Sequence, residues 1–280
     1  MLPKIITINQ QKGGTGKSTL TKNLTTHLAI ERNKKVLNID GDYSCFLSTN
    51  LYGIYDPNGT IGELFQIDEL GNTTFDRNVV FHHVHDNIDI IAGDPKLNEK
   101  QKKLSGEEGT SFILTKWLFN NKKELSSYDY IIIDTHNDFD IFNKNAIAIS
   151  DVVLAPLDPS EINESIATRM EVELEKMKNQ IVEPISGKSY VNAKFYIIGN
   201  KISHNVSSHR EFLNDIKKRD DFLTWFPQKE LFVKASKKIE SINELLEKDK
   251  NKHQRFVKQY AEAMKKIENV IDGNQDLEEK

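Results

Sequence analysis

The sequence predicts an α/β fold: a doubly wound, mostly parallel sheet flanked by helices, with a helical C-terminal addition. The first observation is a series of short apolar segments that read as strands, at residues 5–8, 35–40, 88–92, 130–134, 152–156 and 195–199. The second is that helical patterns fall between them, around residues 113–125, 161–181 and 209–216. Strands of nearly continuous apolar character that alternate with helices are typical of a parallel sheet covered on both faces.

Composition narrows the class of protein. The 280 residues are 38% hydrophobic and 29% charged, with a net charge of −4. The chain therefore lacks the overall basic charge that would indicate a nucleic-acid-binding protein. We expect one domain over residues 1–280, with a core to about 233, a basic helical region over about 234–272 and an acidic tail at 273–280. A single cysteine, Cys45, rules out a disulfide framework within the chain and is expected to be packed rather than reactive.

The location expected from the sequence is cytoplasmic. No apolar run approaches the roughly 20 residues that a membrane helix needs. Pro3 and Lys4 lead directly into the first strand and leave no room for a signal peptide.

The first strand is followed by a glycine-rich stretch at residues 12–19 and then by a helix. Glycines let successive backbone N–H groups curl around phosphate oxygens, and the helix directs its positive N-terminal end at the same anion. In such a loop Lys17 would contact the β- and γ-phosphates, and the hydroxyl of Ser18 would complete the coordination of Mg²⁺. The sequence therefore predicts a nucleotide site made of Gly13, Gly14, Thr15, Gly16, Lys17, Ser18 and Thr19.

The loop departs from the general phosphate-loop pattern in a specific way. Position 11 holds Gln11 where a glycine is usual, and Lys12 follows. This resembles the deviant Walker A loop of the ParA/MinD family of ATPases, whose pattern is Lys-Gly-Gly-x-Gly-Lys-Ser/Thr. The resemblance implies ATP and Mg²⁺ as cofactors and a homodimer that encloses ATP between its subunits. It also makes Lys12 and Lys17 the catalytic lysines, with Lys12 reaching the partner subunit's nucleotide.

Two acidic strand ends complete the predicted site. Asp134 closes an Ile-Ile-Ile-Asp run, the Walker B arrangement, in which a carboxylate holds Mg²⁺ through water; the alternative is an aspartate that caps the next turn. Asp40-Gly41-Asp42 ends the second strand and resembles the family's Asp-x-Asp. The resemblance implies that Asp40 orients the attacking water and that Asp42 supports the metal.

Two turns differ from the family pattern. Tyr43-Ser44 stands where Pro-Gln is common, and His136-Asn137 stands after Asp134-Thr135 where Pro-Pro is frequent. These departures leave the hydrolysis rate open. We expect His136 to be a solvated loop residue rather than a catalytic base.

Asn200 follows the strand at 195–199, where the family reads adenine with an asparagine; a turn-forming role is the alternative. The cluster His82, His83 and His85 is expected in a solvated loop before the strand at 88–92, because no fourth zinc ligand is evident.

The C-terminal third differs in charge from the rest of the chain. Residues 234–266 contain ten basic and five acidic side chains. Apolar residues from Phe256 to Ile271 recur at helical spacing, so one face of this helix is expected to pack on the body of the protein and the basic residues to point outward. They would bind DNA phosphates without reading sequence, although a solvated charged face is the alternative. The candidates are Lys237, Lys238, Lys252, Arg255, Lys258, Lys265 and Lys266.

These observations predict a ParA-like partition ATPase. The resemblance implies an ATP-bound dimer that binds DNA non-specifically, hydrolyses ATP when stimulated by a ParB-like centromere-binding protein, and segregates a plasmid or chromosome as a nucleoid-associated protein. A sequence-specific DNA module is not expected, because only eleven residues precede Lys12. The alternatives are a MinD-like membrane-positioning ATPase, disfavoured by the acidic tail, and a nucleotide-switched binding module with negligible hydrolysis.

Overall fold

The computed structural model describes residues 2–66, 78–160, 165–183, 185–236, 238–247 and 253–274. The candidate DNA-binding residues Lys237 and Lys252, residues 161–164 of a predicted helix and residues 275–280 of the predicted acidic tail lie outside these ranges. Within the described part of the chain, no helix is both long and apolar enough to cross a membrane.

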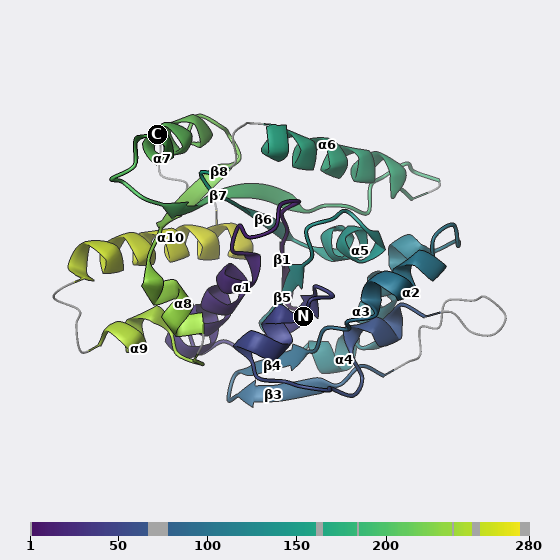
Figure 1. Cartoon of the computed structure of the whole chain (residues 1–280). Helices are drawn as coiled ribbons and strands as arrows, with labels where there is room; N and C mark the ends of the chain where they lie inside the picture. The colour runs from purple at the N-terminus through teal and green to yellow at the C-terminus, as the bar shows by residue number, and fades with distance from the viewer. Residues whose placement is uncertain are drawn as a thin grey trace.

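The described strands form one eight-stranded sheet with β1 near its centre (Figure 1). Every neighbouring pair is parallel except β3 and β4, which are antiparallel. The predicted fold class is therefore confirmed. In spatial order the strands are β3 (Phe81–His85), β4 (Ile88–Ile91), β2 (Val36–Gly41), β5 (Tyr130–Thr135), β1 (Lys4–Ile8), β6 (Val152–Leu157), β7 (Lys194–Ile202) and β8 (Phe222–Pro227).

Helices cover both faces of the sheet, and alternate strand residues point to different layers. Ile6 and Ile8 of β1 belong to one apolar cluster, and Ile5 to another. The first cluster includes residues of α1 (Lys17–Thr26), the helical turn η1 (His27–Glu31), α8 (Glu230–Ser236), α9 (Ile242–Leu246) and α10 (Gln254–Asp272). On the opposite face lie α2 (Leu97–Lys103), α3 (Ile113–Asn120), α4 (Lys122–Leu125), α5 (Ile141–Ile149), α6 (Ser165–Gln180) and α7 (Ser207–Ile216).

The C-terminal helix packs as its spacing predicts. Phe256, Tyr260, Met264, Ile267 and Ile271 are all buried, the most accessible at 5%. They join the cluster that contains the apolar side chains of α1, so α10 is part of the same layer as the helix that follows the glycine-rich loop.

Several sequence-based expectations need correction. His82, His83 and His85 do not lie in a loop but on the edge strand β3, where Phe81 anchors the strand against Trp117 and Tyr128. These contacts are distant in sequence, so local pattern does not reveal them. Strand β8 was not predicted, and the helix expected over 113–125 divides at residue 121 into α3 and α4. Short helical turns also occur at η2 (Leu47–Leu51), η3 (Ile61–Leu64) and η4 (Thr110–Phe112).

Candidate functional site

The glycine-rich loop joins the end of β1 to the first turn of α1. Gly14 and Gly16 have φ values of 81° and 96°, in the left-handed region that favours glycine. A Cβ atom at Gly16 would lie 2.6 Å from the Nδ2 atom of Asn200, so a side chain at this position would require the Asn200 amide to move. The loop therefore needs glycine both for its backbone angles and for its contact with β7.

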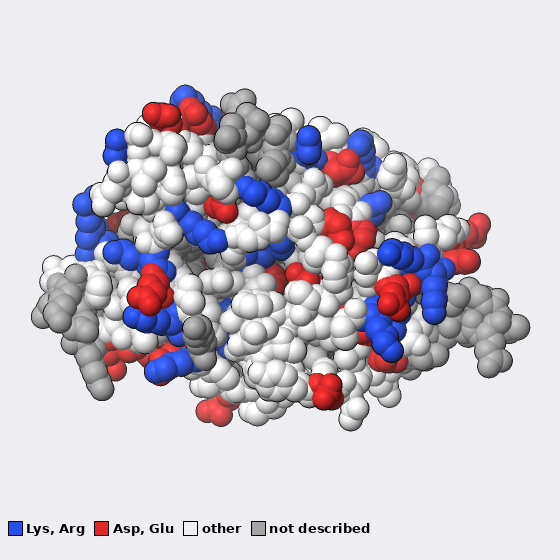
Figure 2. All heavy atoms as spheres, viewed as in Figure 1, with Lys and Arg blue, Asp and Glu red and all other residues white. Residues whose placement is uncertain are grey.

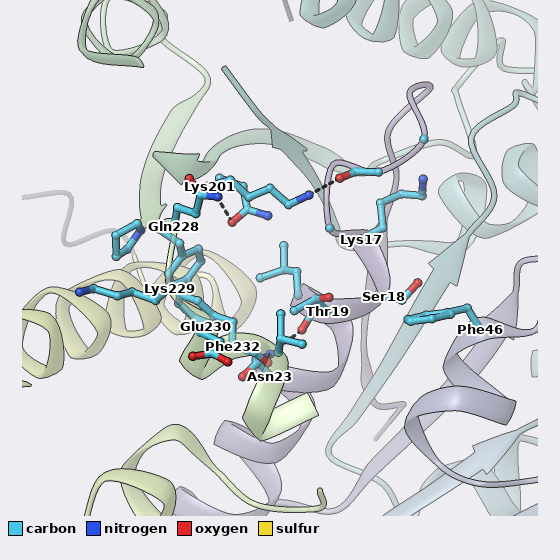
Figure 3. A pocket seen from close by; sticks show the side chains of 18 of the residues that line it. Lys17, Ser18, Thr19, Asn23, Phe46, Lys201, Gln228, Lys229, Glu230 and Phe232 are labelled. Carbon is cyan, nitrogen blue, oxygen red and sulfur yellow. Dashed lines mark hydrogen bonds between the residues drawn. The ribbon is translucent and has the colours of Figure 1, made fainter. Parts of the chain in front are cut away.

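A cavity of about 770 Å³ opens beside this loop. Figure 3 shows Lys17, Ser18 and Phe46 at one end and Gln228, Lys229 and Phe232 at the other, with Thr19 and Asn23 between them. The far end is largely apolar and comes from β8, α8 and the side chain of Met264 in α10. A cavity of this size, polar at a phosphate loop and apolar at its other end, suits a ligand with a phosphate chain and a flat ring.

The two lysines of the loop point in different directions. Lys17 lines the cavity, and its Nζ atom donates a hydrogen bond to the carbonyl oxygen of Gln10 at 3.3 Å. Lys12 is not among the described residues that line the cavity. Its Nζ atom donates to the Oγ atom of Ser160 at 2.7 Å and lies 3.7 Å from a carboxylate oxygen of Asp158. Lys12 thus extends toward the segment that follows β6, with about a third of its side chain exposed.

Asp40 and Asp134 lie side by side at the ends of β2 and β5, where they are register partners. Both are fully buried. Burial raises the pKa of Asp40 to about 6, although both the backbone N–H and the hydroxyl of Ser48 donate to its Oδ2 atom, at 2.8 and 2.6 Å. Burial, and then the nearby Asp40, raise the pKa of Asp134 to about 8, and the Ser18 hydroxyl and Lys17 only partly counter this rise.

The residues around Asp134 fit a bound Mg²⁺. Its Oδ1 atom accepts a hydrogen bond from Thr21 at 3.3 Å, but its buried Oδ2 atom has no hydrogen-bond partner among the described residues. A cation would satisfy this oxygen and offset the cost of two buried carboxylates. Mg²⁺ is usually held by one or two carboxylates together with waters and phosphate oxygens, so Ser18 and Asp134 are a sufficient protein contribution.

Asp42 lies at the wall of the cavity rather than within the buried pair. Its Oδ1 atom accepts a hydrogen bond from the backbone N–H of Ser44 at 2.8 Å, and both residues line the cavity. Its charge adds slightly to the raised pKa of Asp134. The metal-binding role predicted for Asp42 stays a prediction.

Asn200 lies within β7 and not after a strand, because the pairing of β7 with β8 continues to Ile202. Its Nδ2 atom donates to the carbonyl oxygen of Thr15 at 2.7 Å, so its amide contacts the loop while it also lines the cavity. The neighbouring Lys201 donates to the carbonyl oxygen of Gly14 and has a positive φ of 56°.

Lys201 was not predicted as a site residue, although its position directly after Asn200 in the sequence was a usable signal. Ser48 was missed as well, because no local pattern links it to Asp40.

Comparison with known proteins identifies the family of the chain. A family model described as an AAA domain matches residues 3–187. The chain belongs to this family, the ParA/MinD-type P-loop proteins. The chromosome partitioning protein ParA of Myxococcus xanthus is 32% identical over 160 residues, which are 55% of this chain and 52% of that protein. The present chain therefore aligns with about half the length of that relative.

Two solved structures described as plasmid partition proteins have a similar fold. A plasmid partition protein from Borrelia burgdorferi is 26% identical with a TM-score of 0.66, covering 89% of this chain and all of that one. A further structure of such a protein from that organism, bound to AMPPNP, is 24% identical with a TM-score of 0.70, covering 96% and 99%.

In this ParA-type chain the outer face of α10 is basic. Arg255, Lys258, Lys265 and Lys266 are exposed, and their spacing places them along one side of the helix, with Glu262 among them. Figure 2 shows basic side chains on the side of the molecule where α8 and α10 lie, with acidic ones interspersed. Lys238 is exposed but lies 3.6 Å from a carboxylate oxygen of Glu240.

Proposed function

We propose that this protein is a ParA-type partition ATPase that binds ATP with Mg²⁺, pairs with a second copy and binds DNA without sequence preference. The observation that carries the proposal is the divergence of the two lysines in one loop. Lys17 lines the cavity, whereas Lys12 extends out of it toward Ser160. In this proposal, a lysine on the outer side of the phosphate loop would contact a ligand held by a second subunit.

Several of the predicted site residues have a role in this proposal. The loop N–H groups and Lys17 would hold the phosphates, and Ser18 and Asp134 would hold Mg²⁺, which supplies charge neutralisation when bound. Asp40 would orient the attacking water, because phosphoryl transfer depends mainly on positioning. Asn200 would contact the base. Hydrolysis would be slow alone and stimulated by a ParB-like partner.

The DNA surface in this proposal is the exposed basic side of α10, and the buried state of the helix's other side supports it. Because Phe256, Tyr260 and Met264 pack into the core, α10 offers no free apolar face for a lipid surface. This disfavours the membrane-positioning alternative. Release of DNA after hydrolysis would return the protein to a freely diffusing state.

The proposal is tested by fluorescence anisotropy on random-sequence duplex DNA with ATP, ADP and no nucleotide, over a salt series. We expect binding only with ATP and no binding by Lys12→Ala. Each lost phosphate contact lowers the salt slope by about 0.9, so Lys265→Ala/Lys266→Ala is expected to lower it by about 2.

The matched control is Lys102→Ala/Lys103→Ala, an equally adjacent exposed pair on α2, across the sheet from α10. It should leave the slope unchanged. Equal binding in every nucleotide state, or none in any, contradicts the proposal.

A further inference from the structure

The two turns that depart from the family pattern contact one another. Tyr43 follows β2 and His136 follows β5, and 93 residues separate them in the chain. Their rings are stacked, with centroids 3.9 Å apart and planes inclined by 30°. The two loops are therefore joined by an aromatic pair where the related pattern has prolines within each loop.

The loops that carry the two rings also have hydrogen bonds of their own. The Nδ1 atom of His136 donates to a carboxylate oxygen of Asp138 at 3.0 Å, and its carbonyl oxygen accepts from the buried side chain of Asn143 in α5, also at 3.0 Å. On the other loop, the backbone N–H of Cys45 donates to the carbonyl oxygen of Asp42 at 2.8 Å, which closes the turn that carries Tyr43. Within the described residues, the ring contact between the two loops is therefore the stack itself.

The sequence neighbours of both rings line the nucleotide cavity. Asp42 and Ser44 flank Tyr43, and Asn137 follows His136; all three belong to the cavity wall. Asn137 also lies over the glycine-rich loop, since a Cβ atom at Gly13 would lie 3.5 Å from its Nδ2 atom. His136 is not among the described residues that line the cavity. The two rings therefore lie next to the residues that line the cavity and are not themselves part of its described lining.

We propose that the Tyr43–His136 stack is a positioning clamp that holds Asp42, on one loop, and Asn137, on the other, at the phosphate side of the cavity. The inference rests on the proposed function and specifies how residues of the nucleotide site are positioned. Prolines stiffen a loop by restricting its own backbone, whereas a stacked pair restricts one loop relative to the other. A change in either loop is therefore transmitted to the other.

The test is a double-mutant cycle with Tyr43→Ala, His136→Ala and the double variant, assayed for single-turnover ATP hydrolysis and for affinity toward a fluorescent ATP analogue. The strength of an aromatic pair corresponds to about a three- to tenfold effect, which we expect in the hydrolysis rate of each single variant. The double variant should be no slower than either single one, because the shared contact can be lost only once. Affinity should change less than about twofold, since the rings do not line the cavity.

Two further variants separate positioning from general damage. Tyr43→Phe keeps the ring and should restore most of the rate. Tyr55→Ala removes an aromatic side chain that is 74% exposed and should leave the rate unchanged. Additive losses in the double variant, or full activity in the single ones, would overturn the clamp.

Hydrogen–deuterium exchange tests the clamp independently of hydrolysis. Tyr43→Ala should speed exchange at residues 135–140, and His136→Ala should speed it at residues 42–46, while Tyr55→Ala alters neither. Unchanged exchange in the opposite loop would refute the clamp whatever the rates show. If the wild-type protein hydrolyses no ATP but exchange is coupled, hydrolysis fails as a function and the clamp stands.

Discussion

Replacing Glu268 by glutamine tests how α10 is attached to the segment that directly follows α1. Glu268 on α10 accepts hydrogen bonds from the Nε2 atom of His27 at 2.6 Å and from the Nε and Nη2 atoms of Arg32, each at 2.9 Å. The other ring nitrogen of His27 lies 2.9 Å from Glu31. Because both nitrogens face carboxylates, these contacts favour the protonated form of the buried imidazole.

The magnitude follows from the pKa of Glu268. Burial would raise this pKa, but the hydrogen bonds from His27 and Arg32 outweigh burial and lower it from 4.5 to about 2. At 1.36 kcal/mol per pKa unit this corresponds to about 3 kcal/mol of folding free energy. Since glutamine keeps one acceptor oxygen, we expect Glu268→Gln to lower the free energy of unfolding by about 2 to 3 kcal/mol.

The pH dependence has a defined sign. The lowered pKa of Glu268 means that its contribution is present above pH 4.5 and is lost as the pH falls toward about 2. Burial alone would lower the pKa of His27, but the bonds to Glu268 and Glu31 raise it above 6.5. Its contribution is therefore present below pH 6.5 and is lost as the pH rises through the raised pKa. The cluster stabilises most between pH 4.5 and 6.5.

Urea unfolding followed by circular dichroism at about pH 5.5 and about pH 3 measures both effects. The difference between wild type and Glu268→Gln should shrink to less than half at the lower pH. The control is Glu262→Gln on the exposed side of the same helix, expected to change stability by less than about 0.5 kcal/mol. A loss below about 0.5 kcal/mol for Glu268→Gln at pH 5.5, or a difference independent of pH, would show that the ionised Glu268 does not stabilise the fold in this way.

Three further predictions concern the candidate site and helix α1. Gly16→Ala should weaken nucleotide binding in a calorimetric titration, because the added Cβ displaces the Asn200 side chain that lines the cavity. Gly106→Ala, with a similar φ of 93° and nothing within 4 Å, should bind normally. Ser48→Ala removes a hydrogen-bond donor from the buried Asp40, so it should lower the free energy of unfolding in urea by about 2 kcal/mol and slow ATP hydrolysis. An unchanged hydrolysis rate would show that Ser48 has no role in the reaction. Burial lowers the pKa of Lys22 from 10.5 to about 7, so the unfolded chain binds this proton more tightly than the folded one. Between pH 7 and 9, the free energy of unfolding of the wild type should therefore rise by about 2 kcal/mol relative to that of Lys22→Met. A difference that stays constant over this range would contradict the lowered pKa.

The parts of the fold that were predictable are those whose determinants are local. The apolar runs around Ile6, Ile39 and Ile132 are buried on both faces of a sheet and read as strands without further context. The glycine-rich loop was predictable for the same reason, because its chemistry lies within eight consecutive residues. The burial of α10 followed from spacing alone.

The parts that were not predictable depend on contacts between distant segments. Strand β3 carries three histidines, and it is the packing of Phe81 on Trp117 and Tyr128 that holds it on the sheet. The stacking of Tyr43 on His136 joins two loops that look merely polar in sequence. Lys12 points away from the cavity and donates a hydrogen bond to Ser160, which is distant in the sequence.

In the proposed function two copies of this chain close around ATP. Sedimentation velocity of the Asp40→Ala variant, which should bind ATP without consuming it, measures this directly. With ATP and Mg²⁺ we predict a species of two chains, and with ADP, or with Lys12→Ala added, a species of one. A variant that binds ATP but sediments as a single chain in every nucleotide state would contradict the account.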